Sequence, residues 1–410
     1  MSTLIRVRNA TALAVVSLQL ASVSVAAQTA DEPSPEAVPM RLGPLRVKPT
    51  IALTNIGIDN NVFNQPDDLN PKSDFTFTVT PAADLWLRMG RTWVVARIAE
   101  DLTWYQTYTT ERNASPGYSG GWHVPMNRLE FRVDAKRRHA HDRPGFEIDA
   151  RVPRTESQVS GLVELKRLSK TFVGVTATRL RTDYDETAVF VGTSLRFQLN
   201  RTTTGLGLSL RHQLTPLTSI ALTAGRSEDR FEFSPLRNSV STNISGNVTL
   251  DKFALIRGGA TIGYTDFHPE VAGLADYQGL TGAVNLSYTM MGSTRFGFEF
   301  NRDVQYSYEV NQPYYLQTRF AGSVAQHIFG PLDVIARGSL ATLAYRDRAT
   351  AAVTVSNRVD DLNAFGGGIG YHLGRDMRLG FDIDQSYRWS DVSTRQYNNL
   401  RFGSSVTYGF

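Results

Sequence analysis

The residues of this chain that could carry out chemistry are few and widely spread. His139 and His141 lie two residues apart, a spacing that would put two imidazoles on one face of a strand and would suit a metal ion. Arg137, Arg138 and Arg143 flank this pair, and their positive charges would oppose a bound cation. We therefore expect exposed loop histidines here and no metal site.

Nucleophilic catalysis finds no better support. The sequence contains no cysteine, which excludes a thiolate nucleophile, a disulfide framework and an iron–sulfur cluster. Nothing singles out a serine and a histidine that a carboxylate could complete into a catalytic triad. The glycine cluster 366–370 lacks the lysine and hydroxyl residue that end a phosphate-binding loop. The chain is therefore predicted not to be an enzyme and to need no cofactor.

The charges argue against a nucleic-acid partner. There are 43 Lys and Arg residues against 39 Asp and Glu residues, a formal net charge of +4, and both signs are scattered along the chain. Nucleic-acid binding normally shows as a basic patch or stripe. We expect no nucleic-acid partner.

The elements that must carry the polar residues are strands. Apolar and polar or glycine residues alternate with a period of two, most clearly over 129–138, 295–306, 377–389 and 399–410. This period gives each strand one apolar and one polar face. Such runs exceed the usual strand of about 5–6 residues and suit a tilted strand that crosses a bilayer in about 9–11 residues. No run of 18 apolar residues follows the N-terminal segment, so transmembrane helices are not expected.

The spacing of short and long polar breaks predicts an all-β fold, a closed antiparallel transmembrane β-barrel of about 18 strands, with 16 to 20 as the range. Short breaks suit periplasmic turns and longer breaks suit outer loops, and an even strand number places both termini on the periplasmic side. The predicted strands are 45–57, 74–88, 91–107, 118–125, 128–139, 154–168, 171–185, 200–214, 218–233, 237–250, 253–267, 276–290, 293–308, 313–328, 331–346, 358–373, 375–390 and 395–410.

Three segments divide the chain. Residues 1–27 carry Arg6 and Arg8, then a run of small and apolar residues that ends in Val-Ala-Ala, which is typical of a cleaved secretory signal peptide. Residues 28–44 are rich in proline and acidic residues, which indicates a periplasmic linker. Residues 45–410 are predicted to form the barrel in the outer membrane of a Gram-negative cell, in contact with its lipid.

Aromatic residues and the chain end fit this location. Aromatics near strand ends are expected to form girdles at the two lipid interfaces; they are Trp86, Trp93, Trp104, Tyr105, Tyr288, Tyr371, Tyr387, Trp389 and Tyr408. Val406, Tyr408 and Phe410 share one face of the last strand. A terminal aromatic on such a strand resembles the assembly signal that the barrel-insertion machinery reads in bacterial outer-membrane proteins.

The polar faces define candidate lumen residues. Seven acidic and seven basic side chains are expected to point inward on the strands with the clearest alternation, so the lumen would be hydrated without a strong field of one sign. They are Glu130, Asp134, Glu299, Asp303, Asp333, Asp382 and Asp384, and Arg132, Lys136, Arg295, Arg337, Arg378, Arg388 and Arg401.

Five stretches resemble a known family. They are Ser227–Pro235, Arg302–Tyr315, Gly330–Asp347, Gly366–Asp382 and Tyr397–Phe410. They are similar to outer-membrane beta-barrel porins associated with exopolysaccharide and capsule gene clusters. The resemblance implies a barrel of this size that helps polysaccharide cross the outer membrane. We expect such a barrel to work either by passive diffusion or with a periplasmic polysaccharide export complex as a partner. It brings no catalytic residues.

Two functions follow as hypotheses, with an outer-membrane enzyme as a weaker third. The first is an aqueous passage for polysaccharide export or for diffusion of hydrated solutes, since barrels of 16–18 strands are wide enough for a channel. The second is a plugged barrel whose outer loops bind partners. The sequence leaves open the substrate, the gating, the oligomeric state and whether an outer loop folds into the lumen.

Overall fold

The structure is a computed structural model that describes residues 40–409 apart from 252–253, 350–352, 354 and 375. Its main element is one antiparallel sheet of eighteen long strands, with a short strand, β1, added beside β2. The strands are β1 Met40–Leu42, β2 Leu45–Asp59, β3 Asp74–Met89, β4 Thr92–Tyr105, β5 Asn113–Pro125, β6 Leu129–Asp142, β7 Val152–Leu168, β8 Thr171–Tyr184, β11 Arg201–Thr215, β12 Thr218–Phe231, β13 Ser239–Leu250, β14 Ile256–Pro269, β15 Tyr277–Met290, β16 Thr294–Tyr306, β17 Tyr314–His327, β18 Leu332–Arg346, β19 Val359–Leu373, β20 Met377–Ser390 and β21 Tyr397–Tyr408.

The sheet closes on itself where the last strand pairs with the first long one. β21 runs antiparallel to β2 from Ile51↔Tyr408 to Asp59↔Arg401, with a bulge between Leu53 and Ile56. Each of the other long strands pairs with the next long strand along the chain, and β9, β10 and α1 lie between β8 and β11. In hydrocarbon an unpaired backbone group costs several kcal/mol, and closure leaves no unpaired edge. The predicted closed barrel of 18 strands is therefore confirmed.

Most of the predicted strand boundaries agree with the structure to within three residues. The largest difference is in the fourth strand, which begins at Asn113 instead of 118. Its first residues, Asn-Ala-Ser-Pro-Gly, lack apolar alternation, which is typical of a loop. They nevertheless pair with β4, from Asn113↔Thr103 to Gly117↔Ala99. Tertiary pairing here overrides local sequence preference. The predicted signal peptide and Phe410 lie outside the described residues.

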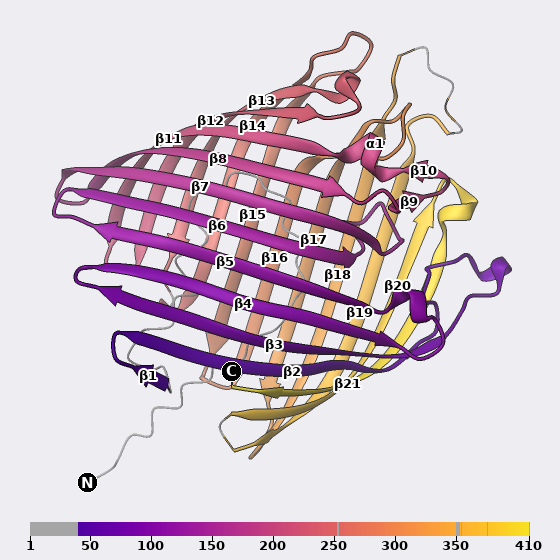
Figure 1. Cartoon of the computed structure of the whole chain (residues 1–410), viewed down its shortest axis with the longest axis horizontal. Helices are drawn as coiled ribbons and strands as arrows, with labels where there is room; N and C mark the ends of the chain where they lie inside the picture. The colour runs from indigo at the N-terminus through magenta and orange to yellow at the C-terminus, as the bar shows by residue number, and fades with distance from the viewer. Residues whose placement is uncertain (1–39, 252–253, 350–352, 354, 375, 410) are drawn as a thin grey trace.

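Turns and loops gather at opposite ends of the barrel. Figure 1 shows tight connections at the end where the described chain begins and ends, and longer connections at the other end. Short turns mark the periplasmic end of such barrels and longer loops the outer end. The outer loops also carry the small elements β9 Val189–Phe190, β10 Thr193–Ser194 and α1 Leu195–Leu199. No helix in the described part of the chain is long and apolar enough to cross a membrane.

The two faces of the wall differ as the alternation requires. Outward positions carry exposed apolar side chains such as Leu208, Leu222 and Phe298. Among the predicted girdle residues, Trp104, Tyr371, Tyr387, Trp389 and Tyr408 are exposed on this outward face.

For three other aromatics the girdle prediction is wrong. Trp86 and Tyr105 are 5% and 3% exposed and share their strand faces with the lumen pair Asp84 and Arg97. Trp93 lies directly opposite Arg88, on the same face as Trp86. Nearness to a strand end did not reveal the side to which these rings point, which only the strand's alternation determines.

Closure can be tested at Gly57 of β2, which pairs with Gly403 of β21. A Cβ on Gly57 would stand 1.9 Å from the carbonyl oxygen of Phe402, a backbone atom that cannot move without shifting the strand. We expect Gly57→Ala to destabilise the barrel by about 3 kcal/mol, the upper range for overpacking. The measurement is the urea midpoint of the heat-modifiable band shift on a detergent gel.

Gly161→Ala on β7 is the matched control, because a Cβ there meets nothing within 4 Å. Equal midpoints for the two variants would contradict the closure described for β2 and β21.

Candidate functional site

One outer loop leaves the wall and crosses the barrel interior. Residues 143–151 connect β6 to β7, and Phe146 in this loop packs against Tyr315, Leu343 and Tyr345 of β17 and β18. β17 lies nine strand positions from β6 in a ring of eighteen, so it stands on the opposite wall. The loop, here named the crossing loop, therefore spans the width of the lumen.

Asp149 fastens the crossing loop to the far wall. Its Oδ2 accepts hydrogen bonds from Arg388 Nη1 of β20 at 2.9 Å and from Arg395 Nη2 at 2.8 Å. Arg388 Nη1 also donates to the backbone oxygens of Phe146 and Glu147 at 3.2 and 3.1 Å. All three charged side chains are less than a tenth exposed. Buried charges need such pairing, because desolvation without a partner is costly.

A second carboxylate extends the cluster along the wall. Asp360 is fully buried and accepts two hydrogen bonds from Arg358, at 3.0 Å to Oδ1 and 2.6 Å to Oδ2. Arg388 Nη2 and Ser390 Oγ also donate to this carboxylate. Arg388 thus joins Asp360 of the wall to Asp149 of the crossing loop through two buried ion pairs.

Glu147 makes the third attachment. Its Oε1 is 2.6 Å from Ser307 Oγ, and its Oε2 accepts the Tyr308 backbone N–H at 3.1 Å. Burial raises the pKa of Glu147 to about 7, although these hydrogen bonds and the charges of Arg358 and Arg395 oppose the rise. The side chain therefore changes charge near neutral pH, at the point where the crossing loop meets the end of β16.

The crossing loop is also held near its root. Arg143 Nη2 and Arg151 Nη1 both donate to the Val62 carbonyl at 2.8 Å, and Arg143 Nε donates to the Asp149 carbonyl at 2.6 Å. Val62 is fully buried in the loop between β2 and β3. Two outer loops therefore fold inward together.

The β16–β17 hairpin narrows the same region from another side. Pairing of β15 with β16 stops at Gly282↔Arg302, whereas β16 stays paired with β17 up to Tyr306↔Tyr314. Above this point the Tyr306 ring packs against Phe231, which lies on the inner face of β12, at 4.8 Å between centroids. The hairpin end therefore leans over the lumen.

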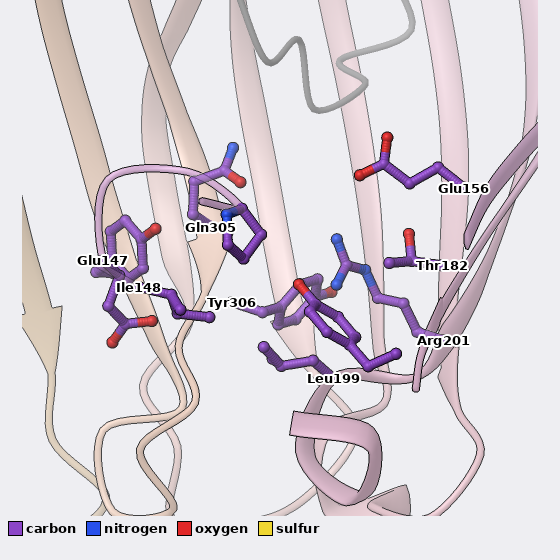
Figure 2. Close-up of a pocket in the computed structure, with 11 residues that line it drawn as sticks. Glu147, Ile148, Glu156, Thr182, Leu199, Arg201, Gln305 and Tyr306 are labelled. Carbon is purple, nitrogen blue, oxygen red and sulfur yellow. The ribbon is translucent and has the colours of Figure 1, made fainter. Parts of the chain in front are cut away.

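A pocket remains between these inward segments. Figure 2 shows Glu147, Ile148 and Gln305 on one side and Glu156, Thr182 and Arg201 on the facing wall. Tyr306 and Leu199 lie between the two groups in this view. Polar side chains stand on both walls, and apolar and aromatic side chains complete the lining. Its residues are Pro144, Glu147, Ile148, Glu156, Thr182, Tyr184, Leu199, Arg201, Gln305, Tyr306 and Tyr315.

The structure brings most of the charged residues named from the sequence into pairs along the wall. Arg337 joins Asp382 at 3.1 Å and Asp384 at 2.7 Å. The remaining pairs are Arg378–Asp333 at 2.6 Å, Arg132–Glu130 at 3.7 Å, Asp134–His123 at 3.6 Å and Glu299–Arg319 at 2.7 Å.

The other sequence-derived candidates occupy different positions. Arg388 belongs to the buried cluster that holds the crossing loop, and Arg401 donates to Thr76 Oγ1 at 3.3 Å. Lys136, Arg295 and Asp303 lie on the strand faces opposite the exposed apolar residues of β6 and β16.

The sequence did not reveal Glu147, Asp149, Arg358, Asp360 or Arg395 as site residues. The crossing loop has no periodicity, and its partners Arg388 and Arg395 lie more than 230 residues away along the chain. The one available signal was Glu147 and Asp149 flanking Ile148 inside an outer loop, a pattern equally common on exposed loops. Within the described residues no group of three or more His, Asp or Glu side chains is placed to hold a metal ion.

Comparisons with known proteins agree with this architecture. The family model described as Putative beta-barrel porin 2 matches residues 32–410. No curated protein matches the chain. OccK2 (OpdF) of Pseudomonas aeruginosa, solved in complex with glucuronate, is similar with a TM-score of 0.50 and 10% identity over 89% of this chain and 98% of that chain. A BenF-like porin from Pseudomonas fluorescens Pf-5 has a TM-score of 0.47 and 11% identity over 89% and 99%. The likeness to OccK2 concerns the fold alone.

The raised pKa of Glu147 predicts that docking of the crossing loop depends on pH. A carboxyl whose pKa is about 7 when docked and near 4.5 when released holds its proton more tightly in the docked state. Docking is therefore most stable below pH 4.5, and the free energy of docking becomes less favourable by about 3 kcal/mol as the pH rises through 7. We expect hydrogen–deuterium exchange of residues 144–150, corrected for intrinsic rates, to be about 100-fold less protected at pH 8 than at pH 5.

Glu147→Gln is the control, since its amide stays neutral throughout and should make protection independent of pH. Protection in the unaltered chain that is constant, or that rises with pH, would contradict the assignment.

Proposed function

The chain belongs to the Putative beta-barrel porin 2 family, and we propose that its barrel is a passage through the outer membrane whose width is set by the crossing loop. An outer-membrane, porin-like barrel is the common ground of the family match and the eighteen-stranded fold. The observation that supports a constricted passage is the contact of Phe146 with the wall opposite its own strand.

The proposed cargo is polar and hydrated. The charged side chains proposed to line the lumen are paired within the wall, as Arg337 is with Asp382 and Asp384. Paired charges hydrate a channel but give little net field to select ions of one sign. Uncharged or weakly charged solutes, including a sugar chain, suit such a lumen. Export of a polysaccharide with a periplasmic partner complex is the version that the sequence resemblance favours.

The proposal includes the route by which the chain reaches the outer membrane. Residues 1–27 would direct export and be removed, residues 28–44 would form a periplasmic segment, and the insertion machinery would read Val406, Tyr408 and Phe410. Of these residues, Val406 and Tyr408 lie on the outward face of β21, and Tyr408 is exposed. A channel of this kind needs no catalytic residue.

A plugged barrel with binding loops is the second candidate. It is favoured by the apolar core that Ile148 of the crossing loop forms with Phe190, Leu195 and Tyr308 of neighbouring outer loops. If this core never opens, the lumen is sealed at its outer end and the loops serve as a surface.

Asp149→Asn separates the two candidates. The substitution removes the negative charge shared by Arg388 and Arg395, and breaking one side of a buried pair costs about 3–5 kcal/mol. We expect the crossing loop to leave the far wall and single-channel conductance in planar bilayers to rise several-fold.

Asp347→Asn is the matched control. Asp347 is an outer-loop carboxylate that accepts hydrogen bonds from Gln312 and Ser356, away from the crossing loop. Conductance that is unchanged in Asp149→Asn would remove the crossing loop as the determinant of width, and absence of conductance in every variant would favour the plugged barrel.

A further inference from the structure

Three strands carry the same pattern on their outward faces. Each has an aliphatic residue, an alanine and an arginine at every second position, within Val133–Arg137 of β6, Val175–Arg179 of β8 and Leu222–Arg226 of β12. All three arginines are exposed. The aliphatic residues and alanines belong to the lipid-facing band, so each arginine is the first charged residue above that band toward the outer loops.

A hydroxyl residue stands directly opposite each arginine on the next strand. The register pairs Arg137 with Ser157 of β7, Arg179 with Thr204 of β11, and Arg226 with Thr242 of β13. Directly opposite residues have their Cβ atoms about 4.5–5.5 Å apart. Each arginine therefore lies beside a hydroxyl group that can also donate a hydrogen bond.

The three pairs lie along one line around the barrel. On β11, Thr204 pairs with Arg179 of β8 on one side and with Glu228 of β12 on the other. Arg226 of β12 pairs with Leu206, the next outward-facing residue of β11 below Thr204. The line thus steps down by two residues as it passes from β8 to β12. Strands of such barrels tilt by about 35–45°, and a level parallel to the membrane must cross their register in such steps. We name Arg137, Arg179 and Arg226 the arginine arc.

Most acidic side chains near the arc pair with arginines outside it. Arg181 forms ion pairs with Asp183 at 2.8 Å and with Glu232 at 3.5 Å, and Arg230 forms one with Glu270. Arg226 lies 3.7 Å from Glu228, which also pairs with Arg230 at 3.4 Å. Within the described residues, Arg137 and Arg179 form no hydrogen bond or ion pair. The arc therefore presents excess positive charge at the lipid boundary.

A fourth pair of the same kind shows what an engaged arginine looks like. Arg302 of β16 faces Thr318 of β17 and donates to its Oγ1 at 2.8 Å, and its Nε donates to the Leu280 carbonyl at 3.1 Å. This guanidinium lies at the point where the pairing of β15 with β16 ends. Arg137 and Arg179 make no such bond and keep their donors for a ligand, whereas Arg226 shares Glu228 with Arg230.

We propose that the arginine arc, with Ser157, Thr204 and Thr242, binds the phosphate groups of phosphorylated glycolipid in the outer leaflet. A planar guanidinium matches phosphate with two parallel hydrogen bonds, and the hydroxyl opposite supplies a third. The long arginine stem can lie over the small alanine below it while the charge stays at the polar boundary. A lipid headgroup is the phosphate source that reaches this level of the outer wall.

The test uses the full-length protein in detergent and native mass spectrometry with diphosphoryl lipid A as the probe. R137Q/R179Q removes two arc arginines, and R181Q/R230Q removes two acid-paired arginines from the same face. A surface arginine contributes about a fivefold change in binding of anionic lipid, so we expect roughly 25-fold weaker binding for R137Q/R179Q and a much smaller change for R181Q/R230Q. Lipid A without phosphates should bind both variants and the unaltered protein equally.

Several outcomes would overturn the proposal. Equal losses in the two double variants would mean that only bulk charge matters. Unchanged binding in R137Q/R179Q would contradict a role of these two arginines. Equally tight binding of phosphatidylglycerol, or displacement of the probe by equimolar inorganic phosphate, would contradict a site for phosphorylated glycolipid. The heat-modifiable band shift reports folding. If R137Q/R179Q does not fold, R179Q alone carries the test with an expected loss of about fivefold.

Discussion

In hydrocarbon every backbone N–H and C=O must find a partner within the protein, and the rest of this structure depends on that requirement. It forces β21 to pair with β2, which closes eighteen strands into a ring. A closed ring of this size is wide enough for a channel, so the wall alone would leave an open lumen. The outer loops, which are free of the pairing requirement, determine how much of that lumen remains.

The crossing loop narrows the lumen with charges as well as apolar contacts. Phe146 packs on the far wall, while Asp149 is held between Arg388 and Arg395. Buried ion pairs add little net stability compared with apolar packing, but they are costly to break on one side and therefore favour one position of the loop. Glu147, whose pKa lies near neutrality because of burial, makes that position responsive to pH. A passage that must open can use such a contact, whereas a purely apolar seal would offer no comparable control.

Period-two alternation was sufficient to predict the wall, because lipid on one side and water on the other impose opposite requirements on neighbouring residues. It located seventeen strands closely and failed in part at Asn113–Pro125, where pairing with β4 replaces the missing pattern. Alternation carries no information about loops that fold inward. Arg388 was expected on the inner face, but its partner Asp149 lies 239 residues away in a segment without periodicity, so its burial followed only from the fold. Trp86 and Tyr105 were misassigned because their positions near strand ends outweighed the face on which they lie.

The position of the crossing loop can be measured directly, because the chain has no cysteine of its own. Phe146→Cys and Leu362→Cys place one thiol on the loop and one on the far wall, where the two side chains belong to the same packed group. In the folded, membrane-inserted protein a short bifunctional thiol reagent should join them, and the joined protein should conduct no more than the same protein before reaction. Absence of cross-linking under conditions where each single cysteine is labelled would contradict a loop that spans the lumen.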